Sequence, residues 1–170
     1  MLAARRVAGA TGRQRRALAG GTAVALCHAM SALPIVPVTS NPHYQRLGGE
    51  TAIARLVDAF YAAMDRREDA RAIRAMHAPE LAATKAVLRM YLGEWLGGPK
   101  RYSPERGPPR LRRMHAPFAI DTTARDAWLA CMRDALQETC ADEALRSELL
   151  AAFGKVADHL VNTASTHRSP

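Results

Sequence analysis

The stretch Ile53-Ala54-Arg55-Leu56-Val57-Asp58-Ala59-Phe60-Tyr61-Ala62-Ala63-Met64 decides the fold class of this chain. Its large apolar side chains recur at steps of three and four residues, which is the spacing of one face of an amphipathic α-helix. A half-buried strand would alternate apolar and polar residues instead, and Val, Ile and Thr form no such runs along the sequence. The chain is therefore predicted to be all-α.

Helical spacing of apolar residues continues on the C-terminal side of this stretch. It predicts further helices over residues 69–76, 79–95, 110–115, 121–136 and 142–161. Pro79 suits the first turn of a helix, and the run Leu96-Gly97-Gly98-Pro99 is a typical helix terminator. Asp142 is expected to cap the last helix, and Asp121 or Thr123 the helix before it.

A segment rich in helix-breaking residues separates two of these helices. It spans residues 99–110 and contains Pro99, Pro104, Gly107, Pro108 and Pro109. No regular helix is expected there, because proline lacks an amide donor and restricts the residue before it. Long ordered loops inside compact domains commonly serve a function.

Composition limits the class of protein. The 170 residues suit one domain with a tail, and 48% hydrophobic residues are enough for a core. Of the net charge of +8, residues 1–16 carry +5, so the remaining chain is nearly balanced and no nucleic-acid binding is expected from it. Cys27, Cys131 and Cys140 are too widely spaced for a zinc site or a disulfide framework, which fits a cytoplasmic location.

The N-terminal region differs from the rest, since no Asp or Glu occurs before Glu50. We expect residues 1–42 to be a basic, disordered extension, residues 43–163 to form the folded domain and residues 164–170 to be a flexible tail. A signal peptide, a transit-like or membrane-surface segment, and an over-long reading frame are alternatives for the extension.

Four side chains suggest a ligand site. Tyr61 continues the apolar stripe of the first predicted long helix, His77 lies at a helix junction, and Trp128 lies on the apolar face of a later helix. Each carries a polar hydrogen that needs a partner when buried, so together they can line a cavity for a small polar ligand. His115, between two helices, is a candidate iron ligand, although a lone histidine is more often solvated.

Several motifs of the chain, taken in order, resemble the group II truncated haemoglobins over residues 44–161. The stretches that carry the resemblance are Leu47-Gly48-Gly49, Phe60-Tyr61, Met76-His77, Trp95-Leu96-Gly97-Gly98-Pro99, Pro109-Arg110-Leu111-Arg112, His115-Ala116-Pro117-Phe118 and Asp126-Ala127-Trp128-Leu129. The resemblance implies a truncated globin fold, a two-over-two helical sandwich around haem b.

The same resemblance implies residue roles. His115 would be the proximal iron ligand, Tyr61 and Trp128 would donate to an iron-bound ligand, and His77 would occupy the junction position of the distal side. Arg112 would hold a haem propionate, a role in which Lys85 could also serve. The other residues expected around the haem are Thr84, Leu88, Leu92, Tyr102, Leu111 and Phe118.

As a function, the resemblance implies reversible binding of O₂, NO and CO, with slow O₂ release, in a monomer or homodimer served by an unidentified reductase. A haem-dependent peroxidase or nitric oxide detoxification enzyme is an alternative that uses the same iron. A second alternative is a basic helical protein that binds nucleic acid or a membrane through residues 1–16 and holds no haem.

Overall fold

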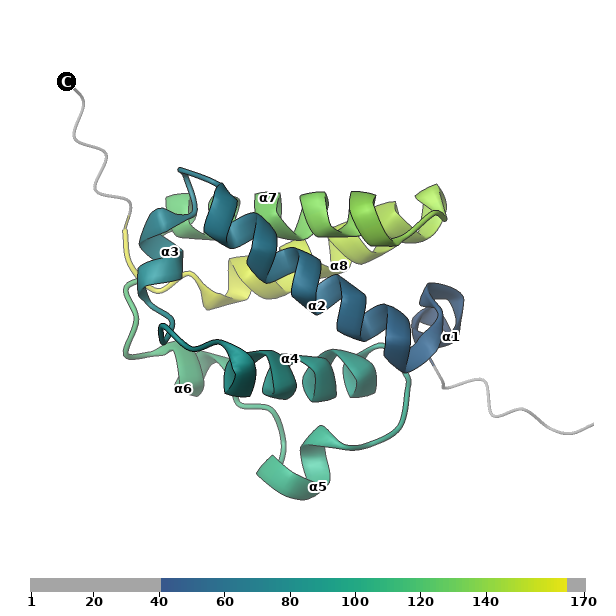
Figure 1. The fold of residues 1–170 in the computed structure, drawn as a ribbon. Helices are drawn as coiled ribbons and strands as arrows, with labels where there is room; N and C mark the ends of the chain where they lie inside the picture. The colour runs from purple at the N-terminus through teal and green to yellow at the C-terminus, as the bar shows by residue number, and fades with distance from the viewer. Residues whose placement is uncertain (1–40, 165–170) are drawn as a thin grey trace, which may run out of the picture. The chain divides into compact units, whose positions relative to one another are not determined.

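The computed structural model describes residues 41–164, and within this range every regular element is a helix (Figure 1). The prediction of an all-α fold is confirmed. The helices are α1 (His43–Leu47), α2 (Gly49–Arg66), α3 (Arg71–Ala75), α4 (Ala82–Trp95), α5 (Tyr102–Arg106), α6 (Leu111–His115), α7 (Thr122–Thr139) and α8 (Glu143–Leu160). None of these helices is long and apolar enough to cross a bilayer. The predicted extension and tail fall almost entirely outside the described residues.

The four long helices form two antiparallel pairs. Helix α2 runs against α4, and α7 runs against α8 (Figure 1). Helix α2 also packs along α7, so it joins the two pairs. The short helix α5 lies on the far side of α4 from α7, whereas α6 lies beside α4 and packs against α8 (Figure 1).

The stretch that predicted the fold lies at the centre of the core. Ile53, Leu56 and Phe60 of α2 are almost completely buried, in contact with a cluster that includes Met132 of α7 and Leu149 of α8. Full burial of such a side chain contributes about 1.5–3 kcal/mol. The apolar stripe of α2 therefore holds the two helix pairs together.

Aspartates cap the two C-terminal helices. The Asp121 carboxylate accepts a hydrogen bond from the Ala124 amide (2.8 Å), and that of Asp142 accepts one from the Leu145 amide (3.0 Å). These bonds satisfy amides that have no partner inside the helix. Of the two predicted caps for α7, the structure has Asp121.

Two glycines at the end of α4 allow a close crossing of chain segments. Gly97 has φ +94°, and a Cβ atom there would overlap the carbonyl oxygen of Asn41. At Gly98 a Cβ would lie 2.5 Å from the ring of Tyr44. The Tyr44 amide donates to the Leu96 carbonyl at 2.8 Å. The predicted terminator is confirmed, and its two glycines also let α1 pack closely against the end of α4.

Two predictions about local structure are wrong. Helix α4 begins at Ala82, so Pro79 lies before its first turn. The proline-rich segment contains α5, which was not expected. Pro104 falls in the first turn of α5, where an amide has no partner inside the helix. The Glu94 carboxylate accepts hydrogen bonds from the Ser103 amide (2.9 Å) and hydroxyl, so a side chain distant in sequence stabilises this turn.

Candidate functional site

Two adjoining cavities, of about 540 and 360 Å³, lie between α4, α6 and the ends of α7 and α8. Their size is that of small-molecule and cofactor sites. His77, Thr84, His115 and Trp128 line both cavities. The larger cavity also contains Tyr61, Leu88, Leu92, Tyr102 and Leu111, and the smaller one Phe118. All the site residues predicted from the sequence except Arg112 are thus brought to one place.

His115 is the last residue of α6 and lies half-buried at both cavities. Its Nδ1 is 2.8 Å from the Leu111 carbonyl oxygen, which can only accept, so Nδ1 carries the hydrogen. The lone pair of the neutral ring is then on Nε2, as a metal ligand requires. Residues 41–164 hold no group of three or more His, Cys, Asp or Glu side chains that could bind a metal ion. A metal at His115 would need its other ligands from a cofactor, as haem iron does.

Asn162, just after α8, holds the segment that carries His115. Its side-chain amide donates to the Phe118 carbonyl (2.9 Å) and to the His115 carbonyl (3.4 Å). Its side-chain oxygen accepts from the Ile120 amide at 2.9 Å. The sequence reasoning missed Asn162, because an Asn beyond a helix end carries no signal of its distant partners.

Tyr61 presents a buried hydroxyl to the larger cavity. Its side chain is 3% exposed, and its ring packs edge-on against Phe60, with centroids 5.0 Å apart. Burial raises the pKa of Tyr61 to about 12, so the hydroxyl keeps its proton at neutral pH. The described part of the chain offers this hydroxyl no hydrogen-bond partner. Because it opens onto the cavity, the hydroxyl is free to donate a hydrogen bond to a ligand there.

His77 and Trp128 complete the polar part of the site. His77 Nδ1 donates to the Ile73 carbonyl (2.8 Å), which fixes the ring at the end of α3 and leaves Nε2 facing away from that bond. The Trp128 ring packs against Phe60 and Phe153, with centroids 5.4 and 5.9 Å apart. Its indole N–H also lacks a partner among residues 41–164. Nε2 of His77 and the indole N–H of Trp128 are therefore both left without a partner from the described residues at the cavities.

Aromatic rings line the part of the larger cavity nearest α5. Tyr91 stacks on Trp95 (6.4 Å between centroids) and meets Tyr102 edge-on (5.5 Å). Trp95 in turn stacks on Phe153 at 5.2 Å. Tyr91 and Trp95 are cavity residues that the sequence did not single out as such. A flat apolar group could lie against these rings.

The cations near the cavity differ from the expectation. Arg112 is exposed on α6 and borders a separate surface pocket. Arg106 of α5 lines the larger cavity, although the sequence did not single it out. Lys85 is engaged elsewhere, because its Nζ lies 3.0 Å from the Asp58 carboxylate. Asp58 also binds Arg89, at 2.7 Å.

A helical sandwich around an apolar cavity that is lined by His115, His77, Tyr61 and Trp128 has the architecture and the site of a globin. The family described as bacterial-like globin matches residues 42–162. Group 2 truncated hemoglobin YjbI of Bacillus subtilis is 34% identical over 122 residues, which are 72% of this chain and 89% of that protein. The chain belongs to the bacterial-like globin family, and within it to the group II truncated haemoglobins.

Solved structures agree with this membership. The cold-adapted truncated hemoglobin of Pseudoalteromonas haloplanktis TAC125 is 36% identical, with a TM-score of 0.70 over 71% of this chain and 98% of that one. The group II 2-on-2 hemoglobin of Agrobacterium tumefaciens is 35% identical, with a TM-score of 0.69 over 72% of this chain and 95% of that one. The predicted truncated globin fold is confirmed, and the family implies a haem that binds diatomic gases.

Proposed function

We propose that this chain holds a b-type haem through Nε2 of His115 and binds O₂, and also NO and CO, reversibly. The observation that carries the proposal is the hydrogen bond from His115 Nδ1 to Leu111, since it leaves Nε2 free at the cavity on the residue that the family resemblance assigns to the iron. A single protein ligand suffices for haem, whose porphyrin supplies the other four donors. The bound iron would supply the site for the gas.

The donors of the cavity fit a polar gaseous ligand. O₂ bound to ferrous iron carries partial negative charge, so it accepts hydrogen bonds. The partnerless Tyr61 hydroxyl and the Trp128 indole N–H, both at the larger cavity, are the donors that we assign to it. One net hydrogen bond of about 1 kcal/mol changes an equilibrium roughly fivefold. Two donors therefore favour slow O₂ release. In agreement, a similar structure is the oxygen-avid truncated haemoglobin of Bacillus subtilis, 32% identical to this chain, with a TM-score of 0.65 over 71% of this chain and 98% of that one.

The cofactor's other contacts are part of the proposal. Thr84 and Leu88 of α4 would face the gas, while the aromatic rings beside α5 would border the porphyrin. Arg106, which lines the cavity, and Arg112, on the helix of His115, are the cations that we assign to the propionates. We also propose a cytoplasmic location, which would keep the free thiols of Cys131 and Cys140 reduced.

An absorption spectrum of the purified full chain, reconstituted with haem b, tests the proposal. We expect a Soret band, a ferrous form that binds CO, and spectral conversion on adding O₂. A chain that takes up no haem would refute the assignment. Haem uptake with both axial positions filled by protein and no gas binding would refute the gas-binding function.

A further inference from the structure

Cations without a partner gather in one segment of the described chain. Residues 100–115 contain six Lys or Arg residues and one acidic residue, Glu105. Of the six, Arg101 forms an ion pair with Glu50. The other five form no ion pair with any residue of 41–164, and they are Lys100, Arg106, Arg110, Arg112 and Arg113.

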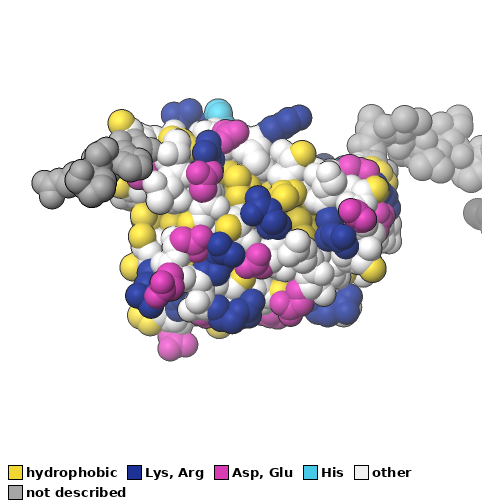
Figure 2. Space-filling model, turned by 90° about the horizontal axis from the view of Figure 1, so that it is seen from above, with side chains coloured by type: hydrophobic (Ala, Val, Ile, Leu, Met, Phe, Trp, Pro, Cys, Tyr) yellow, Lys and Arg dark blue, Asp and Glu magenta, His cyan; other side chains and the backbone are white. Residues whose placement is uncertain are grey.

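Elsewhere among residues 41–164, more than half of the Lys and Arg side chains form ion pairs. Arg67 contacts Asp69 and Asp134, and Arg125 contacts Asp126 and Asp158, all within 3 Å. Figure 2, which views the molecule from above, shows Lys and Arg side chains intermixed with Asp and Glu. The segment of residues 100–115 is therefore a local excess of positive charge. Arg106 and Arg112 would bind the propionates in the haem-loaded chain, so Lys100, Arg110 and Arg113 are the cations left free, and we call these three residues the α5–α6 cationic surface.

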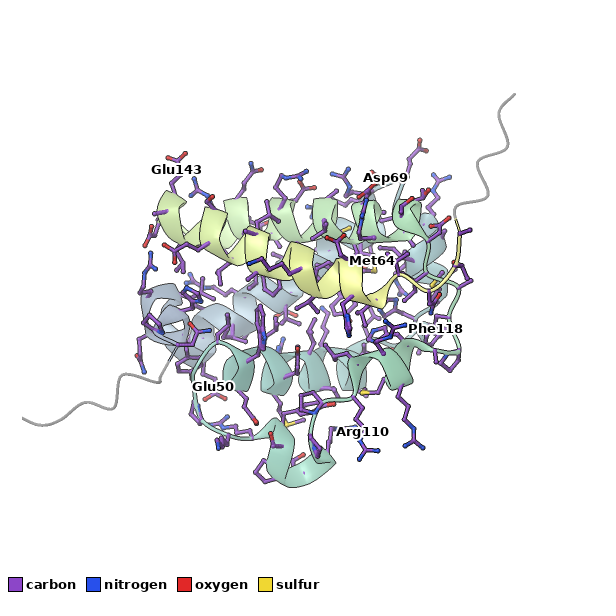
Figure 3. The ribbon with its side chains drawn as sticks, turned by 180° about the vertical axis from the view of Figure 1, so that it is seen from behind. Glu50, Met64, Asp69, Arg110, Phe118 and Glu143 are labelled. Atoms are coloured by element: carbon purple, nitrogen blue, oxygen red, sulfur yellow. The ribbon has the colours of Figure 1, made fainter. Side chains whose placement is uncertain are left out.

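This surface lies beside the candidate iron ligand. Arg113 is in the same short helix as His115 and is exposed. Arg110, labelled in Figure 3, lies where the chain passes from α5 into α6. Helix α6 also lines the cavity, so a molecule bound over these arginines would be separated from the cavity by little more than one helix.

We propose that the α5–α6 cationic surface docks an acidic one-electron carrier protein, of the iron–sulfur or flavin kind, that returns the iron to the ferrous state. The proposal rests on the haem function proposed above. One electron would leave the reduced carrier and reduce ferric iron to ferrous, and no bond to the protein would form or break. Positive charge steers an acidic partner to this surface. Its closeness to His115 favours an electron donor as that partner, because electron transfer depends on a short path to the iron, whereas the binding of a nucleic acid or a membrane does not.

A binding measurement tests the surface without relying on electron transfer. Calorimetry would titrate oxidised, acidic plant-type [2Fe–2S] ferredoxin into the haem-loaded full chain at low and high salt. We expect the double variant Arg110→Glu/Arg113→Glu to weaken binding by roughly tenfold or more at low salt. The matched control is Arg66→Glu/Arg133→Glu, which reverses two exposed, unpaired arginines on α2 and α7. Because both variants retain the arginines of residues 1–16, any contribution of that segment cancels.

A kinetic measurement then tests the role. Stopped-flow absorption would follow reduction of the ferric protein by reduced ferredoxin and by an uncharged hydroquinone. We expect the rate with ferredoxin to fall with rising salt and in the α5–α6 variant, and the rate with hydroquinone to stay the same. Equal effects of the two double variants would overturn the proposal. It would also be overturned if Arg110→Glu/Arg113→Glu weakened the binding of duplex DNA or anionic vesicles but left the binding of ferredoxin unchanged. Normal Soret bands in all variants separate these outcomes from failure of the haem assignment.

Discussion

The ring of Tyr61 meets the imidazole of His77 edge-on, with ring centroids 5.6 Å apart and planes inclined by 80°. His77 is itself fixed by its bond to Ile73. Tyr61 is therefore braced by a ring that cannot easily turn, and its hydroxyl is held towards the cavity. Pre-positioned donors lose little entropy when a ligand arrives, which increases the value of each hydrogen bond.

Replacing Tyr61 with Phe should speed O₂ release. The substitution keeps the ring and removes the donor, so we expect the O₂ dissociation rate to rise roughly fivefold or more, because a net hydrogen bond is worth about 1 kcal/mol. Stopped-flow displacement of O₂ by CO gives the rate. The control is Tyr44→Phe, which alters a buried tyrosine that packs on α2 and α4 rather than at the cavity. Equal rates in the wild type and Tyr61→Phe would remove the donor role.

Replacing His115 with Ala should release the cofactor. We expect the affinity for haem to fall by more than about a hundredfold, since even residues that only orient a metal ligand change affinity by 10–100-fold. Titration of haem into the chain, followed by absorbance, measures the affinity. Added imidazole should restore the ferrous spectrum of His115→Ala, because it can fill the ligand position. His159→Ala, on the exposed face of α8, is the control, and a spectrum unchanged by His115→Ala would show that another residue holds the iron.

The buried hydroxyl of Tyr61 should make stability depend on pH in the alkaline range. The pKa of Tyr61 is raised from 10.0 to about 12 in the folded chain, so the folded state binds more protons than the unfolded state between these values. The corresponding stabilisation is complete below pH 10 and is lost as pH rises towards 12.

Denaturant unfolding of the wild type and of Tyr61→Phe, from pH 8 to 11.5, measures this effect. The difference in free energy of unfolding between the two proteins should be constant up to about pH 9.5. Above that pH it should shift against the wild type. A difference that is constant throughout would mean that the hydroxyl titrates normally.

Replacing Gly97 with Ala should destabilise the fold by about 2 kcal/mol or more. The new Cβ would overlap the Asn41 carbonyl, and φ is in the left-handed region, which costs about 1 kcal/mol by itself. Gly48→Ala is the control, because Gly48 also has a left-handed backbone (φ +109°), but its added Cβ would lie 3.2 Å from the nearest atom, Ala52 Cβ, and would overlap no backbone. Thermal or denaturant unfolding gives both values. Equal losses at the two positions would show that the crossing of α1 and α4 relaxes freely.

Features encoded by local pattern could be predicted from the sequence. The three- and four-residue spacing of α2 reflects burial on one face, and Asp142 caps α8 as its position suggests. The cavity residues on α2, α4 and α7 followed from a family resemblance. Spacing alone would not have distinguished Tyr61 or Trp128 from ordinary core residues, because both continue an apolar stripe.

Features that depend on tertiary contacts could not be predicted. Helix α5 forms because Glu94 binds Ser103, two residues that belong to different helices. Arg106 reaches the cavity only because α5 exists, so the sequence directed attention to Arg112 instead. The ion pair of Lys85 with Asp58 likewise joins α4 to α2, and no local sequence pattern predicts that these two residues pair.

The side-chain hydrogen bonds of Asn162 fix the position of the C-terminal end of the domain. A chain cut after Val161 would retain all eight helices, yet it would lose both carbonyl contacts to the segment of His115 and Phe118 and the bond to the Ile120 amide. The end of α8 and the segment that follows α6 are therefore joined through a residue that lies outside both helices. Fraying of the C-terminus should therefore lower the affinity for haem before it lowers the helix content.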